Sequence, residues 1–182
     1  QPGDPAAGIA DGLTVKKDLA LWLKADQGLQ LDKDGGVLFW KDSSGAAPGG
    51  LHPHDGSQAD PGKRPRLIAK AIPAIRFDGK DDFLHLAGAP LWGQDFSLFV
   101  VASDRGTNTK HREIISNWHR RGRSTSSFFF GLTGQSNIRL SDAFAPAGSV
   151  KNPSKPFLLS GFNSAQGAFT YQGRTQLASA GR

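Results

Sequence analysis

The segment AIRFDGKDDFLHL, residues 74–86, holds two short apolar runs on either side of a polar turn. Ile75 and Phe77 alternate with small or polar neighbours, which is the period of a β-strand with one buried face. An Asp-Gly pair favours chain reversal, because Gly accepts a positive φ and Asp can hydrogen-bond to nearby backbone. The segment therefore predicts a β-hairpin whose apolar face is covered by a second sheet.

Similar apolar runs recur along the chain with turn residues between them. The chain has 23 Gly, 11 Pro and only 37% hydrophobic residues, which suits many short strands better than a helical bundle. Residues 96–102 form the most apolar run and are predicted to lie centrally in a sheet. This pattern predicts an all-β fold, a two-sheet antiparallel β-sandwich. The other expected strands are 37–41, 113–118, 127–132, 137–140, 157–162 and 168–171.

A length of 182 residues fits one domain. Residues 1–12, rich in Pro, Gly, Ala and Asp, are predicted to be a flexible leader, and residues 13–182 a single sandwich domain. Two explanations are open for the end of the chain, where such a sandwich would need further strands. Either the fold is a shorter variant, or another segment or a protein partner covers an open sheet edge.

Three further pieces flank residues 74–86 in a recognisable order: ALWLKAD (20–26), VLFWKDSSG (37–45) and FSLFVVA (96–102). Together the four pieces resemble the concanavalin A-like lectin/glucanase superfamily, and more narrowly the laminin-G-like domains of secreted bacterial proteins. The resemblance spans residues 19–178. It implies a jelly-roll sandwich that lacks its last strands, and a non-catalytic carbohydrate-binding or cell-adhesion module.

The chain contains neither Met nor Cys and starts with Gln1. The missing Met predicts removal of a signal peptide and, with the resemblance, a secreted, periplasmic or cell-surface location. The lack of Cys excludes disulfides and thiolate metal sites. No apolar run approaches the ~20 residues that a membrane helix needs, so no membrane span is expected.

Catalysis is not expected. A retaining glycosidase needs two carboxylates about 5 Å apart, but Glu113 is the only Glu, and its strand offers no acid at i+2 or i+4. Arg112, Tyr171 and either His111 or His119 supply the residue types of a polysaccharide lyase, without a spacing that matches a lyase motif. A hydrolase or a lyase therefore remains a weaker alternative to a binding module.

Asp78, Asp81 and Asp82 are the candidate metal ligands. Calcium takes six to eight oxygen ligands, largely from carboxylates and carbonyls, and related domains of the resembled type bind calcium beside their ligand site. The alternative is that Asp-Gly-Lys-Asp-Asp is turn chemistry alone. Of the two explanations, turn chemistry is favoured.

A basic segment supplies the candidate contacts for a glycan, in particular an anionic polysaccharide. Arg offers a planar fork that suits sulfate or carboxylate, and Trp can stack on a sugar ring. A solvated charged loop is the usual alternative, and nucleic acid is not favoured because no nucleic-acid fold signature is present. A second functional possibility is a structural or subunit-contact domain of a larger, processed or multi-chain protein. The candidate ligand-binding residues are Arg105, Lys110, Arg112, Trp118, His119, Arg120, Arg121 and Arg123.

Overall fold

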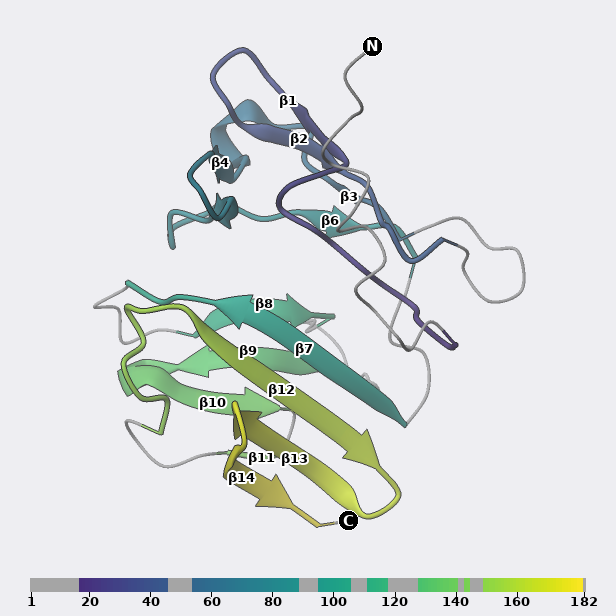
Figure 1. Ribbon diagram of the computed structural model, residues 1–182, viewed down its shortest axis with the longest axis vertical. Coiled ribbons are helices and arrows are strands. Elements are labelled where there is room, and N and C mark those ends of the chain that lie inside the picture. Colours follow the sequence, from purple (N-terminus) through teal and green to yellow (C-terminus); the bar gives the residue numbers. More distant parts are fainter. Residues whose placement is uncertain are drawn as a thin grey trace. The chain divides into compact units, whose positions relative to one another are not determined.

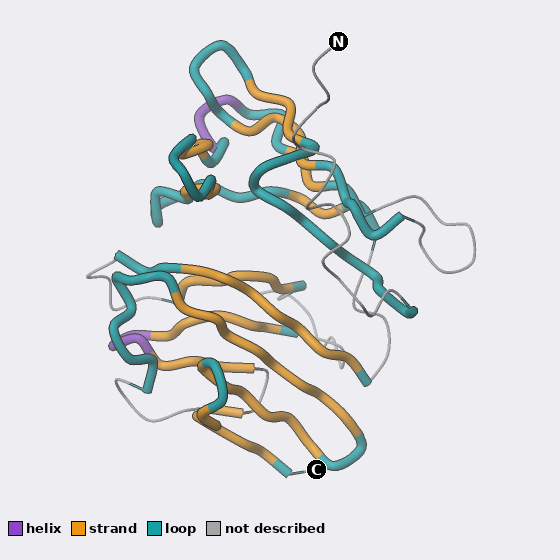
Figure 2. The backbone as a smooth tube through the Cα atoms, viewed as in Figure 1, coloured by secondary structure: helices purple, strands orange, loops and turns teal. Residues whose placement is uncertain are grey.

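The protein is all-β (Figures 1 and 2). Every named strand pair in the computed structural model is antiparallel, and the described helical structure is limited to two short 3-10 turns. This confirms the predicted fold class, while the jelly-roll order stays a prediction. The structure describes residues 17–45, 54–88, 95–105, 111–117, 128–140, 143–144 and 149–181.

The chain divides into two compact units, Gln1–Trp92 and Gly93–Arg182. In the described part of the chain, no helix is both long and apolar enough to cross a membrane. The first unit contains one four-stranded sheet of order β1-β2-β3-β6 and one two-stranded sheet. Its strands are β1 (Leu29–Leu31), β2 (Val37–Trp40), β3 (Gly56–Ser57), β4 (Arg66–Ile68), β5 (Ala74–Arg76) and β6 (His85–Leu86), with a 3-10 turn at Pro61–Lys63.

The hairpin predicted for residues 74–86 does not form. β5 pairs with β4, and β6 pairs with β3, so the two apolar runs belong to different sheets. The turn between them closes on itself, because the Asp82 carboxylate accepts the backbone N–H of Asp78 at 2.8 Å. The alternating pattern reports which face of a strand is apolar, but it does not report which strand lies beside it.

The second unit is a two-sheet sandwich. One sheet has the order β14-β13-β12-β7 and the other β11-β10-β9-β8. The sheets touch at Gly161 of β12, where a Cβ would lie 3.0 Å from the Phe130 ring and 3.1 Å from the Leu140 side chain. The strands are β7 (Phe96–Ala102), β8 (Arg112–Ser116), β9 (Phe129–Thr133), β10 (Asn137–Leu140), β11 (Ala143–Phe144), β12 (Phe157–Ser164), β13 (Gly167–Gln172) and β14 (Thr175–Ala180), with a 3-10 turn at Gly134–Ser136.

The apolar core of the described residues lies almost wholly in the second unit. Phe130, Ile138, Leu140 and Leu159 are completely buried there, and each such side chain stabilises the fold by ~1.5–3 kcal/mol relative to an exposed one. Of the buried apolar side chains in the described residues, Val37 is the one that belongs to the first unit. The two halves of the chain are therefore stabilised by different kinds of interaction.

Strand β7 has the predicted bounds but not the predicted position. Among the described strands it ends its sheet instead of lying centrally, and its residues alternate between exposed and half-buried. An apolar run indicates a strand that is covered on both faces, yet Phe99 and Val101 are 64% and 75% exposed. Strand β14 was not predicted, because TQLASA lacks the bulky alternating residues that mark a strand.

Candidate functional site

Three carboxylates meet in the turn after β5. The acidic loop, defined as Asp78, Asp81 and Asp82, places one oxygen of each side chain within 4.8 Å of the others. Asp78 and Asp81 are exposed, and Asp82 is half-buried. Gly79 adopts a φ of 77°, a value that L side chains rarely take and that lets the chain reverse here. The structure thus brings together the three residues predicted as metal ligands.

The backbone of the loop fixes two of these side chains. The Oδ1 atom of Asp78 accepts the N–H groups of Lys80 at 2.8 Å and Asp81 at 3.3 Å, and Oδ2 of Asp82 accepts the N–H of Asp78 at 2.8 Å. Within the described residues, no hydrogen bond is assigned to the Asp81 carboxylate. The loop is therefore ordered by its own turn, with the Asp81 carboxylate left for contact with an outside group.

Folding shifts the pKa values of Asp78 and Asp82 in the acidic loop in opposite directions. The N–H of Lys80 holds the pKa of Asp78 below its ordinary value, whereas burial and the neighbouring Asp78 and Asp81 charges raise the pKa of Asp82. Carboxylates that repel one another are relieved by a cation or by hydrogen-bond donors. One carboxylate oxygen from each of Asp78, Asp81 and Asp82 could serve as a ligand of a calcium ion, with solvent completing the coordination.

The predicted basic segment is only partly described. Arg105 is exposed after β7. Arg112 begins β8 and forms an ion pair with the Asp104 carboxylate at 2.7 Å, with both side chains mostly buried. An anion at Arg112 would therefore have to displace Asp104. The other candidates lie outside the described residues: Lys110, Trp118, His119, Arg120, Arg121 and Arg123.

Asp42, in contrast to the carboxylates of the acidic loop, is a buried carboxylate held by several hydrogen bonds. It is 3% exposed and accepts the backbone N–H groups of Trp22, Ser44 and His54 at 2.9, 2.9 and 3.0 Å, together with the Ser44 hydroxyl at 3.0 Å. Burial alone would raise the pKa of Asp42, but these hydrogen bonds outweigh it and hold the pKa below the ordinary 3.8. With this many donors on one carboxylate, Asp42 joins three segments of chain and is a structural residue.

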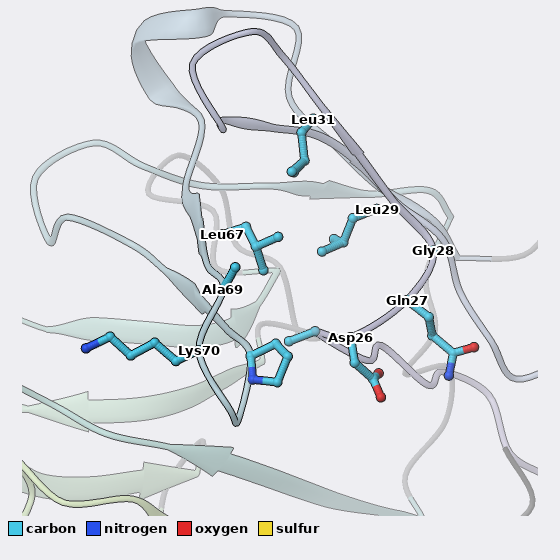
Figure 3. Close-up of a pocket in the computed structure, with 10 residues that line it drawn as sticks. Asp26, Gln27, Gly28, Leu29, Leu31, Leu67, Ala69 and Lys70 are labelled. Carbon is cyan, nitrogen blue, oxygen red and sulfur yellow. The ribbon is translucent and has the colours of Figure 1, made fainter. Parts of the chain in front are cut away.

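The first unit also has an open cleft of about 540 Å³ beside β1 and β4. Figure 3 shows the Leu29 and Leu67 side chains pointing toward one another, whereas Lys70 points away. Ligand pockets usually combine apolar walls with a few converging polar groups. This cleft has a mixed lining, apolar at Leu29 and Leu67, and Lys70 points away from it. No sequence pattern signalled it, because its residues come from separate segments. Its lining is Ala25, Asp26, Gln27, Gly28, Leu29, Leu31, Leu67, Ala69, Lys70 and Pro73.

Comparison with protein-family models, with curated proteins and with solved structures found no match to this chain, so the resemblance to the concanavalin A-like superfamily stays a prediction from the sequence.

Proposed function

We propose that the chain is a non-catalytic carbohydrate-binding or adhesion module of an exported protein, and that the acidic loop is its contact for the glycan. The observation that supports this most is the convergence of Asp78, Asp81 and Asp82 within 4.8 Å at an exposed turn. Carboxylates accept hydrogen bonds from sugar hydroxyls, and a loop held by its own backbone loses little entropy when it binds.

Calcium fits the same proposal. Asp81 and the outward oxygens of Asp78 and Asp82 would hold the ion, which supplies further coordination positions for sugar hydroxyl oxygens. Such a site favours a neutral glycan whose binding needs the metal. The anionic polysaccharide expected from the basic segment would instead bind without calcium and weaken as salt increases.

The test is a titration of the protein with neutral, sulfated and uronic-acid polysaccharides, with calcium or with EDTA, at two salt concentrations. We expect calcium-dependent binding to a neutral glycan. Asp81→Asn should weaken it at least about tenfold, and folding should be retained because this carboxylate takes no part in the turn. Asp34→Asn, an exposed acid in a different turn, is the matched control and should bind as the unaltered protein does.

Two results would contradict the acidic-loop assignment. One is neutral-glycan binding that survives both EDTA and Asp81→Asn. The other is salt-sensitive binding to a polyanion that Asp81→Asn leaves unchanged, which would move the contact to residues 105–123. The second functional candidate, a subunit-contact domain, is favoured by β7, which no other described strand pairs with on its outer edge. Failure of every polysaccharide to bind under any condition would support this candidate.

A further inference from the structure

Among the described strands, β7 lies at the edge of its sheet, and it contains no charged residue. Its sequence FSLFVVA contains neither Pro nor a charged residue, and its register with β12 is unbroken across seven residue pairs. The alternation of exposure extends beyond the strand, from Asp95 to Arg105. The N–H and C=O groups that point away from β12 can pair with another strand.

The neighbouring edges carry features that discourage pairing, and β7 does not. β8 ends the facing sheet and carries Arg112 and Glu113, with a bulge between Glu113 and Ile115. β14, at the far side of the β7 sheet, has no charged residue either, but it carries a bulge at Leu177, which is skipped where Thr170 and Tyr171 of β13 pair with Ala178 and Gln176. Charges and bulges are the usual protection of sheet edges. Their absence in β7, beside the 64% exposed Phe99 and 75% exposed Val101, marks it as a surface to be covered.

The exposed face of β7 and its flanking residues is symmetric in chemical class about its centre, except that an acid at one end corresponds to a base at the other. It runs acid, serine, apolar, apolar, serine, base: Asp95, Ser97, Phe99, Val101, Ser103 and Arg105. An identical strand laid antiparallel about a two-fold axis at Val100 would meet this face with every class matched. Such self-complementarity is what an isologous dimer interface requires.

We propose that β7 pairs antiparallel with β7 of a second copy of this chain, which joins two four-stranded sheets into one. In this register Asp95 lies opposite the partner's Arg105, and Phe99 lies opposite the partner's Val101. Directly opposed residues in an antiparallel pair lie close enough for such contacts, and opposite charges there are favourable. A parallel pair would instead place each Asp95 beside the partner's Asp95, so charge selects the antiparallel arrangement.

The inward-facing residues of β7 also favour a second copy of this chain as the partner. Leu98 and Val100 face the sandwich interior yet are only half-buried, because β7 ends its sheet. A second copy would extend the sheet, and the side chains on each face of β7 would gain a cross-strand neighbour. This inference does not depend on glycan binding, since the acidic loop lies in the other unit.

The first test is the mass of the protein in solution, by light scattering or sedimentation over a range of concentrations. We expect a concentration-dependent dimer that Val101→Lys converts to a monomer, because a charge in the middle of an edge strand opposes pairing. Ser179→Lys, on the exposed side of β14, is the matched control and should remain dimeric. A monomer at every concentration, or a dimer indifferent to Val101→Lys, would overturn the proposal.

The second test examines the register by exchanging the end charges. Asp95→Arg and Arg105→Asp should each weaken dimerisation about tenfold, since each places like charges opposite one another, and the double variant should restore it. These residues are exposed, so folding should be unaffected. Single variants without effect, or a double variant as weak as either single one, would refute this register. Slow hydrogen exchange in a monomer at the N–H groups of β7 that point away from β12 would mean that another strand of the same chain covers the edge, and would overturn the dimer.

Discussion

The two units of the chain are stabilised in opposite ways. In the second unit, Phe130, Ile138, Leu140 and Leu159 form a fully buried apolar cluster between two sheets. In the first unit, the buried side chains include Asp42, His54 and Gln58, which hydrogen-bond to backbone groups far away in the sequence. Apolar packing is non-directional, whereas a hydrogen-bonded carboxylate needs its partners in place. The first unit therefore depends on a few polar residues to an extent that the second does not.

Arg64 illustrates the polar mode of the first unit. Its guanidinium donates to the Asp32 carboxylate at 2.9 Å and to the carbonyl oxygens of Gln58 and Ala59 at 2.9 and 2.6 Å. One side chain thus fixes the turn after β1 and the segment after β3, strands of three and two residues. Strands this short bury little apolar surface, so their positions must be specified by directional bonds.

The largest expected effect is on the apolar core. Phe130→Ala should destabilise the second unit by about 3–5 kcal/mol, because it removes a fully buried ring and leaves a cavity against Gly161. The measurement is hydrogen exchange of peptides from that unit. Phe99→Ala removes the same side chain from a 64% exposed position, and should cost far less in the monomeric protein. Equal losses would show that the ring at Phe130 is not part of a tight core.

A smaller effect is expected from the buried carboxylate of the first unit. Asp42→Asn should cost about 2–3 kcal/mol, because one carboxylate oxygen becomes an NH₂ group that faces N–H donors. Peptides containing Trp22, Ser44 and His54 should exchange faster, while Asp34→Asn leaves them unchanged. If Asp42→Asn were as stable as the original protein, Asp42 would not be the junction of these three segments.

Acid should destabilise the first unit more than the second. This is the smallest of the expected effects, because it is absent at neutral pH. Hydrogen bonds from Arg64 and from the Gly62 N–H lower the pKa of Asp32 and Asp60. In Asp42, hydrogen bonds outweigh the burial that would raise its pKa. A carboxyl group whose pKa is lowered by folding stabilises the fold above its ordinary value of 3.8, and this contribution is lost as the pH falls further, through the folded-state pKa. Asp82, whose pKa is raised, opposes the trend.

Hydrogen exchange measured from neutral pH to pH 3 should therefore show the first unit opening before the second, with intrinsic exchange rates corrected for pH. Asp42→Asn supplies the control, since the variant should lose part of its acid sensitivity along with its stability. Equal acid sensitivity of both units, or an unchanged pH profile in Asp42→Asn, would contradict the assignment of the polar network to the first unit.

Much of the strand content was predictable from the sequence, but the pairing was not. The bounds of β7 match residues 96–102, and β10 matches residues 137–140, because a short run of apolar residues, continuous or alternating, is a local signal. The pairing of β5 with β4 is decided by packing between distant segments, and local alternation does not encode it. Strand β14 gave no clear signal, because Leu177 is its only bulky apolar residue.

The acidic loop was predictable because its three residues lie within five positions of one another. Its carboxylates converge as expected, although the loop joins two different sheets instead of closing a hairpin. The Asp42 junction was not identified, because its donors come from residues 20 positions before and 12 after it. Arg112 looked like a free cation in the sequence, and its ion pair with Asp104 depends on the placement of β7 beside the sandwich core.

The pairing of β7 with β12 has a consequence for the order in which the second unit folds. β12, β13 and β14 are consecutive and pair as neighbours, whereas four strands of chain, β8 to β11, lie between β7 and its partner. Closing a long loop costs more entropy than closing a short one, so local pairs form sooner. We expect the three-stranded meander to appear early in refolding and β7 to dock last, with the N–H groups of β12 that face β7 among the last to gain protection in a pulse-labelling experiment.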